Sequence, residues 1–163
     1  MRKTLRSRRP GMTLVETVIV IMIVVMIIFG IFEYCRYLMV RNLMDNAART
    51  GLRYAIVNNT STTVAADTST VVTGGTLTSG TVVPDRMAGQ ETTAFKSGTF
   101  TVTVSGVHNG TTYTGNNVNA LVAGDMMTVT VTGTFNFMNI MPIINLGTMT
   151  MTSSPTMVCE GAN

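Results

Sequence analysis

The sequence predicts an α+β protein: a long N-terminal transmembrane helix that continues into an amphipathic helix, packed on a small antiparallel β-sheet. Three observations predict this class. An apolar run follows a basic N-terminus, a helical period continues beyond that run, and the C-terminal half alternates Thr with Val, Phe or Met. A chain of 163 residues accommodates one modest domain and one membrane element.

Composition and charge agree with this class. Only 12% of the residues are charged and 45% are hydrophobic, which favours a membrane segment and a Thr-rich β domain. Five basic residues precede residue 11, whereas the remainder holds six basic and eight acidic residues. A nucleic-acid surface needs basic residues spread over a folded face, but a basic cluster beside an apolar run is typical of a cytoplasmic flank. We therefore expect a cytoplasmic N-terminus and no nucleic-acid binding.

Residues 1–11 are the predicted basic leader, and residues 12–34 are the predicted transmembrane helix. Within 12–32 the only clearly polar residues are Thr13, Glu16 and Thr17. This run spans roughly 30 Å as a helix, the thickness of a bilayer core. An ordinary secretory signal begins in the same way. However, the run is long, no small-x-small cleavage pattern follows it, and the helical pattern continues past it.

Residues 35–57 are predicted to extend this helix outside the membrane. Its apolar positions recur at steps of three and four, from Tyr37 through Met44 to Tyr54. A second face carries charges at steps of four, where Asp45 can pair with Arg49. Asn58 and the polar residues after it end the helix. The two segments together would form a rod of about 70 Å.

The rest of the chain is predicted to form a connecting region and a β domain. Residues 58–98 are rich in Thr, Ser and Gly, and we expect a connection with short strands at best. Residues 99–163 are the β-rich exported domain. Residues 99–107, 126–137 and 148–152 alternate as strands with one buried and one wet face, and the turn-rich residues 109–119 join the first two. Such a sheet needs packing on the extramembrane helix to be stable.

The sharpest functional motif lies between the leader and the apolar run, with the sequence GMTLVE at residues 11–16. A peptidase at the cytoplasmic face could cut after Gly11, which has no side chain to obstruct it. Glu16 would then be the fifth residue of the mature chain. A carboxylate in a membrane helix is costly unless paired, and the new amino group of Met12 is a natural partner, in the same chain or a neighbouring subunit. Alternatively, Glu16 merely sits at the bilayer interface near the helix N-terminus.

Three stretches carry a family resemblance: VE at residues 15–16, FGIFEYCR at 29–36 and NAARTGLRYA at 46–55. They resemble the start of TadE/TadG-like minor pilins, or pseudopilins, of the tight-adherence (Tad) type IVc pilus. The signature residues on the helix are Gly30, Glu33, Arg36, Asn46, Arg49, Gly51 and Arg53.

The resemblance implies a structural and assembly role without enzymatic activity. It implies processing by a prepilin peptidase at Gly11, and partners among other pilins, pseudopilins and inner-membrane pilus assembly proteins. The expected location is the inner (cytoplasmic) membrane, crossed once, with the C-terminal domain periplasmic or extracellular and able to enter the pilus. The rival hypothesis is an uncleaved, single-pass membrane protein whose β domain binds an envelope or extracellular ligand.

Two features of the predicted helix have two interpretations each. Gly30 and the small residues up to Gly51 could let another helix approach closely, although small residues packed within the chain's own domain explain 47–51 more simply. Glu33 and Arg36 lie three residues apart where the helix would leave the bilayer. They form either an interfacial pair or a contact with another assembly component.

The remaining reactive residues predict no catalytic, cofactor or metal site. Cys35 and Cys159 allow one disulfide in an oxidising compartment, but Cys35 is equally compatible with a buried free thiol. His108 is the only histidine and has no serine, cysteine or acid at a recognisable spacing. Asp67, Asp85 and Asp125 stand in turn contexts, where Asp commonly caps.

Overall fold

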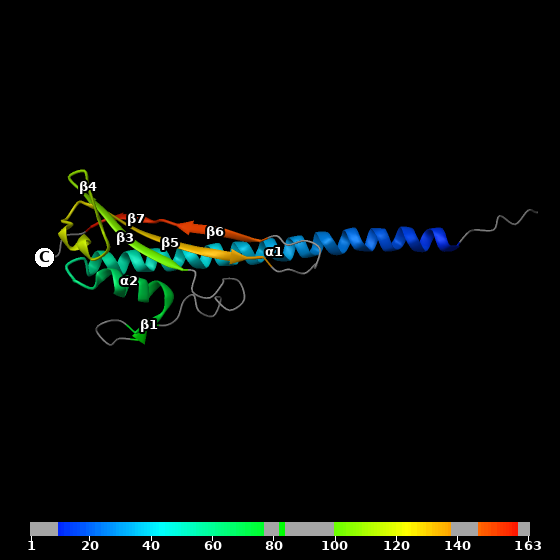
Figure 1. Cartoon of the computed structure of the whole chain (residues 1–163), viewed down its shortest axis with the longest axis horizontal. Coiled ribbons are helices and arrows are strands. Elements are labelled where there is room, and N and C mark those ends of the chain that lie inside the picture. Colours follow the sequence, from blue (N-terminus) through cyan, green and yellow to red (C-terminus); the bar gives the residue numbers. More distant parts are fainter. Residues whose placement is uncertain (1–9, 77–81, 84–99, 138–146, 160–163) are drawn as a thin grey trace, which may run out of the picture. The chain divides into compact units, whose positions relative to one another are not determined.

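The computed structural model describes residues 10–76, 82–83, 100–137 and 147–159. The chain divides into two compact units, Met1–Arg36 and Tyr37–Asn163. The helices are α1 (Pro10–Val57), α2 (Val64–Thr73) and the 3₁₀ helix η1 (Gly115–Ala120). The strands are β1 (Gly75–Thr76), β2 (Val82–Val83), β3 (Thr101–His108), β4 (Thr111–Thr114), β5 (Met126–Asn136), β6 (Thr148–Ser153) and β7 (Thr156–Val158) (Figure 1). The predicted α+β class is confirmed.

The first unit contains the apolar part of α1. Every side chain from residue 14 to residue 32 is exposed, and most of them are large and apolar. The part of α1 from Leu14 is long and apolar enough to be a candidate membrane span. A helix that is apolar on all sides is stable only where lipid or other protein surrounds it.

The part of α1 in the second unit is amphipathic, as predicted. Its buried face is apolar, and the following residues are all at most 1% exposed: Val40, Met44, Ala47, Ala48, Leu52 and Ala55. Arg41, Arg49 and Arg53 are exposed on the other face. The predicted pairing of Asp45 with Arg49 is not among the ion pairs of the described residues.

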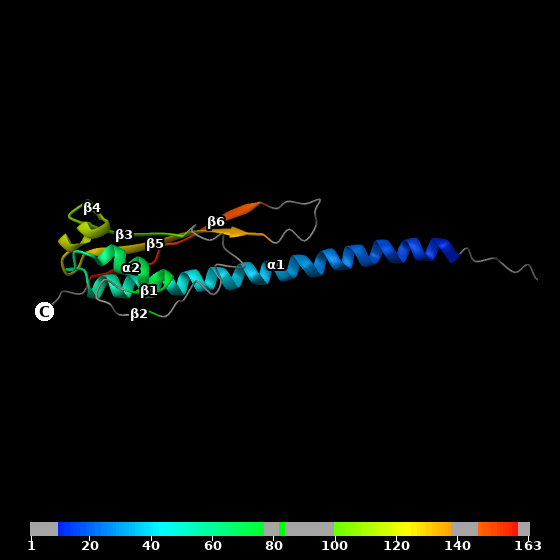
Figure 2. The same cartoon turned by 60° about the horizontal axis from the view of Figure 1, so that its bottom comes forward.

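The main sheet is antiparallel, with the strand order β4-β3-β5-β6, and β7 pairs with the start of β5 (Figures 1 and 2). Strands β3, β5 and β6 confirm the three predicted alternating stretches. In β5 the residues Met127, Val129, Val131, Gly133 and Phe135 are buried, and the threonines between them are half-buried on the other face. The predicted division into a buried face and a wet face is therefore confirmed.

Residues 109–119 join β3 to β5 as expected, but they contain regular secondary structure as well as turns. Strand β4 and helix η1 lie there. The reversal from β3 to β4 is a two-residue hairpin, since His108 pairs with Thr111. Asn109 and Gly110 both have positive φ, at 47° and 79°. The Asn-Gly pair is a strong signal for such a turn, and the sequence contained it.

The connecting region contains a correction, because helix α2 lies where short strands at best were expected. Val64, Thr68, Val71 and Val72 form its buried side at helical spacing. Packing overrides the weak helix propensity of its valines and threonines. Gly51 of α1 lets α2 approach, because a Cβ atom at Gly51 would lie 2.5 Å from Val72 Cγ2. Asp85, which was expected to stand in a turn, lies outside the described residues.

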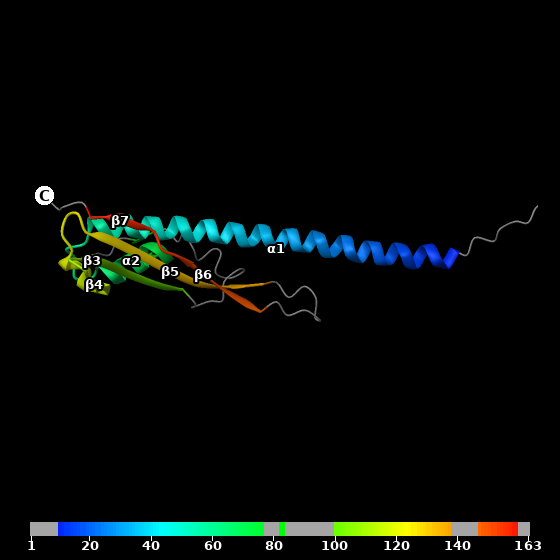
Figure 3. The same cartoon turned by 90° about the horizontal axis from the view of Figure 1, so that it is seen from above.

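The core of the second unit lies between α1 from Tyr37 onward, α2 and the inner face of the sheet (Figure 3). Phe135 is completely buried, and its ring meets that of Tyr37 edge to face, with 5.8 Å between the ring centroids. Phe137 contacts Phe135 in the same manner at 5.2 Å. Aromatic pairs of this geometry stabilise beyond the area they bury. The helix therefore provides the packing that the small sheet was predicted to need.

Candidate functional site

The predicted processing motif lies at the beginning of α1. The helix starts at Pro10, so Gly11 and Met12 belong to its first turn. Glu16 follows on the same helix, with an exposed side chain and apolar Leu14, Val15 and Val18 exposed around it. In the described part of the chain Glu16 takes part in no ion pair. This geometry leaves the carboxylate available to a group outside the helix.

Glu33 and Arg36 form the ion pair that their spacing predicted. Arg36 Nη2 lies 2.6 Å from Glu33 Oε1, and the side chains are only 19% and 13% exposed respectively. Pairs three residues apart face each other on a helix. Removing either partner would leave a partly buried charge without this partner, which costs more than losing an exposed ion pair.

The other signature residues divide into two groups. Gly51 is buried and contacts Val72 and Thr68 of α2, so its small size serves packing within the chain. Around Gly30 nothing lies within 4 Å of an added Cβ atom. Asn46, Arg49 and Arg53 are exposed. The open side of Gly30 and the exposed polar face are thus the signature positions that remain accessible to another molecule.

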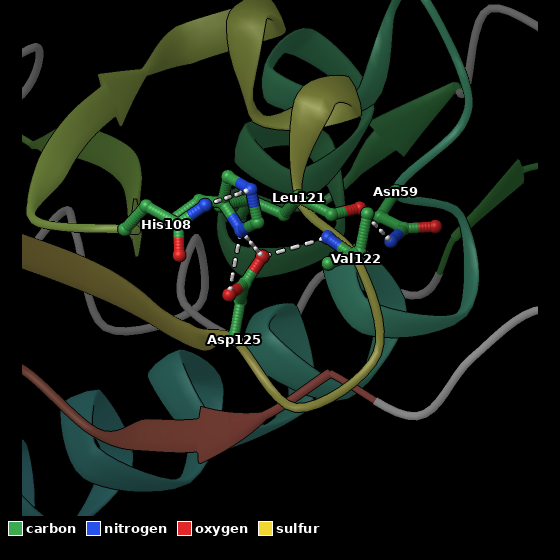
Figure 4. A network of polar contacts seen from close by, with 6 residues as sticks. Asn59, His108, Leu121, Val122 and Asp125 are labelled. Atoms are coloured by element: carbon green, nitrogen blue, oxygen red, sulfur yellow. Dashed lines mark hydrogen bonds and ion pairs between the residues drawn. The ribbon is translucent and has the colours of Figure 1, made fainter.

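A network of side-chain hydrogen bonds lies at one end of the sheet (Figure 4). His108 Nδ1 lies 2.9 and 2.8 Å from the two carboxylate oxygens of Asp125. The backbone N–H of Val122 donates to Asp125 Oδ2 at 2.7 Å. The Asn109 side-chain amide lies 3.0 Å from His108 Nε2. The network joins the end of β3 to the turn that precedes β5.

Asp125 also connects this turn to the C-terminal segment. Its carbonyl oxygen accepts a hydrogen bond from Cys159 N–H at 2.8 Å, and Gly124 N–H donates to the Cys159 carbonyl at 3.0 Å. The Val122 N–H and then the His108 side chain lower the pKa of the Asp125 carboxyl. Burial, with the nearby Asp125 charge, raises the pKa of the Cys159 thiol. The cluster holds three chain segments together.

The sequence analysis treated His108 and Asp125 as isolated residues, and the structure brings them together. Val107 of β3 pairs with Met126 of β5, so their neighbours His108 and Asp125 come to lie side by side. Pairing the two predicted strands in register would have revealed this contact. No group of three His, Cys, Asp or Glu residues suited to a metal ion occurs within the described ranges.

Both cysteines are free thiols in the structure, with Cys159 buried and Cys35 exposed. The disulfide that the sequence allowed is therefore not formed. The alternative of a free thiol at Cys35 holds, but that thiol is exposed and not buried.

Most of helix α1 matches a known protein family. Residues 11–53 match the family described as TadE-like protein. The N-terminal helix is TadE-like. The match begins at Gly11 and includes Glu16 and all the signature residues, so the predicted resemblance is confirmed over this segment. This match supports the interpretation of the chain as a membrane protein associated with the tight-adherence pilus. No curated protein and no solved structure matches the chain.

Proposed function

We propose that this chain is a pilin-like minor component of a tight-adherence pilus, cut by a prepilin peptidase between Gly11 and Met12. The observation that carries the proposal is the start of the TadE-like match, which falls on Gly11. The five basic residues of the leader precede this residue, and the apolar run follows it. Gly11 is the last residue of the proposed leader, so the family match begins one residue before the proposed cut and leaves out the basic part of the leader.

Glu16 is proposed to pair with the amino group that the cut creates on Met12. In the uncut chain Glu16 is an exposed carboxylate on an otherwise apolar stretch of helix. A charge in that position is costly in lipid unless an opposite charge neutralises it. Pairing with Met12 of a neighbouring subunit would also set the axial position of one helix against another.

The partners follow from the two kinds of exposed surface on α1. The apolar side chains of residues 14–32 are proposed to pack against helices of other pilins or pseudopilins, with Gly30 allowing close approach. Inner-membrane assembly proteins are proposed to contact the polar face of the helix. The leader faces the cytosol, and Tyr37–Asn163 lies in the periplasm or outside the cell.

Processing is tested by intact mass and N-terminal sequencing of the protein from its native host. We expect the mature chain to begin at Met12. Gly11→Ala should slow the cut, because a methyl group obstructs the peptidase, whereas the matched Gly30→Ala should be cut normally. A mature protein that retains residues 1–11 would instead favour the anchored, ligand-binding alternative.

The role of Glu16 is tested separately from the cut. Glu16→Gln keeps the size of the side chain and removes its charge. We expect normal membrane insertion and cleavage but a loss of piliation or of incorporation into the pilus, measured by microscopy and by immunoblotting of sheared pili. Normal pili with Glu16→Gln would contradict the proposed pairing.

A further inference from the structure

In the second unit, helix α1 exposes one face to solvent, opposite the face that packs on the core. The members of this exposed face recur at steps of three and four residues, which places them on one side of a helix. They are Leu38, Asn42, Asn46, Arg49 and Arg53. In Figure 3 the helix lies along the margin of this unit, beside the sheet. We name this exposed face the outer stripe.

The outer stripe carries two positive charges that the described part of the chain does not neutralise. Arg49 and Arg53 lie about one helical turn apart and enter no ion pair among the described residues. The described carboxylates of the second unit are withdrawn from the surface, since Asp67 is buried and Asp45 and Asp125 are half-buried. The two arginines are therefore available to an acidic group of another molecule.

The charges of the outer stripe disfavour a second copy of this chain as its occupant. Two copies inserted in one membrane in the same direction have parallel α1 helices. If these helices packed through their outer stripes in register, Arg49 and Arg53 of one copy would lie beside Arg49 and Arg53 of the other. Like charges repel at this range, and no exposed carboxylate in the described parts of the second unit offsets the repulsion. The charge pattern therefore favours a different chain.

The other end of the outer stripe is apolar, and this distinguishes a partner helix from a polyanion. Leu38 is 38% exposed, and Met39 beside it is 55% exposed. A polyanion is bound through many contacts between phosphates and basic residues, and it would leave these two side chains uncovered. A helix with apolar residues beside Leu38 and carboxylates beside Arg49 and Arg53 would cover the apolar end and neutralise the charged end.

We propose that the outer stripe binds an acidic helix of a different membrane protein, which lies parallel to α1 and places its carboxylates beside Arg49 and Arg53. The inference rests on the proposed function, because it assumes that this chain assembles with other helices from the same membrane. It adds the chemistry of the partner. An acidic neighbour is attracted and the chain's own copy is repelled, so the two arginines determine which helix packs here.

The first test uses a charge-reversed copy of the full chain as the probe for an acidic helix. The reversed chain carries Arg49→Glu and Arg53→Glu, and the arginine chain keeps both arginines. Both chains carry Cys35→Ser, which removes the exposed thiol, and Asn42→Cys within the outer stripe, while Cys159 is buried. They are mixed in vesicles of a zwitterionic lipid, and tags of two sizes separate mixed from unmixed disulfide-linked dimers. After correction for random pairing, mixed dimers should exceed dimers of the arginine chain about fivefold.

Two controls separate attraction between charges from general association. Thr112→Cys, on exposed β4, replaces Asn42→Cys and should give no preference for mixed dimers. Salt at about 1 M, where the Debye length is about 3 Å, should remove the preference. Equal yields of mixed and unmixed dimers at low salt would overturn the proposal. Retention of the arginine chain on immobilised polyphosphate without a preference for mixed dimers would replace the acidic helix with a polyanion. If circular dichroism shows that the reversed chain is unfolded, Arg53→Glu alone serves as the probe.

The second test asks whether the partner in the native host is acidic. Arg49→Glu with Arg53→Glu should lower the amount of the chain in sheared pili about fivefold, whereas Arg49→Lys with Arg53→Lys keeps the charge and should stay within about twofold of the unmodified chain. Both variants should begin at Met12. Unchanged incorporation of the charge-reversed chain, cut normally, would overturn this inference and leave the proposed function intact. A chain that retains its leader would contradict the proposed function, whatever the vesicle experiment gives.

Discussion

The two parts of α1 share one helix but differ in what stabilises them. Before Tyr37 the helix exposes Leu14, Ile23 and Phe29 by 40–66% each. After Tyr37 it buries Val40, Ala48 and Leu52 completely against the sheet and α2. Helix formation itself contributes little net stability, so each part depends on its surroundings. The first part needs lipid or other helices, and the second part is supported by its own chain.

The largest expected effect comes from a matched pair of leucines. Leu52→Ala removes a completely buried side chain and should lower the free energy of unfolding of the second unit by about 2–5 kcal/mol. Leu14→Ala, at a side chain that is 66% exposed, should change it by less than about 0.5 kcal/mol. Denaturant unfolding in detergent, followed by tyrosine circular dichroism, measures both. Equal effects would show that the two parts do not differ as described.

A matched pair of glycines also tests the difference between the two parts of α1. Gly51→Val forces a side chain into Val72 and Thr68 and should destabilise the second unit by about 1–3 kcal/mol. Gly30→Val meets open space and should not affect that unit. The same unfolding experiment measures both variants. If Gly30 mediates contact with another helix, Gly30→Val should instead impair assembly in the membrane.

The smallest expected effect concerns the Asp125 network, which exists only in the second unit. The folded-state pKa of Asp125 is lowered, so its stabilising contribution is present above the unfolded pKa of about 3.9 and is lost as pH falls through the folded value. The melting temperature of Asp125→Asn should therefore lie below that of the unmodified chain at about pH 5. The gap should close in more acidic solution. A gap that widens with acid would contradict the assigned direction.

The secondary-structure elements that could be predicted are those that depend on interactions between residues close together in the sequence. The three alternating strands and the continuous helix follow from local periodicity, and each was found within a few residues of its predicted ends. Helix α2 was missed because its threonines and valines have weak helix propensity, and its helical form depends on burial beside Gly51. Strand β7 was missed because three residues carry too little pattern to be recognised.

The candidate sites also fall into two groups, those predicted from the sequence and those that only the tertiary structure revealed. Gly11, Glu16 and the Glu33–Arg36 pair lie on one helix, where spacing along the chain determines neighbours, so the sequence by itself identified them. The contact between His108 and Asp125 and the position of β6 at the end of the strand order were decided only by the tertiary structure. Both depend on which strands pair and in what register, and residues far apart in the chain become neighbours only through that pairing.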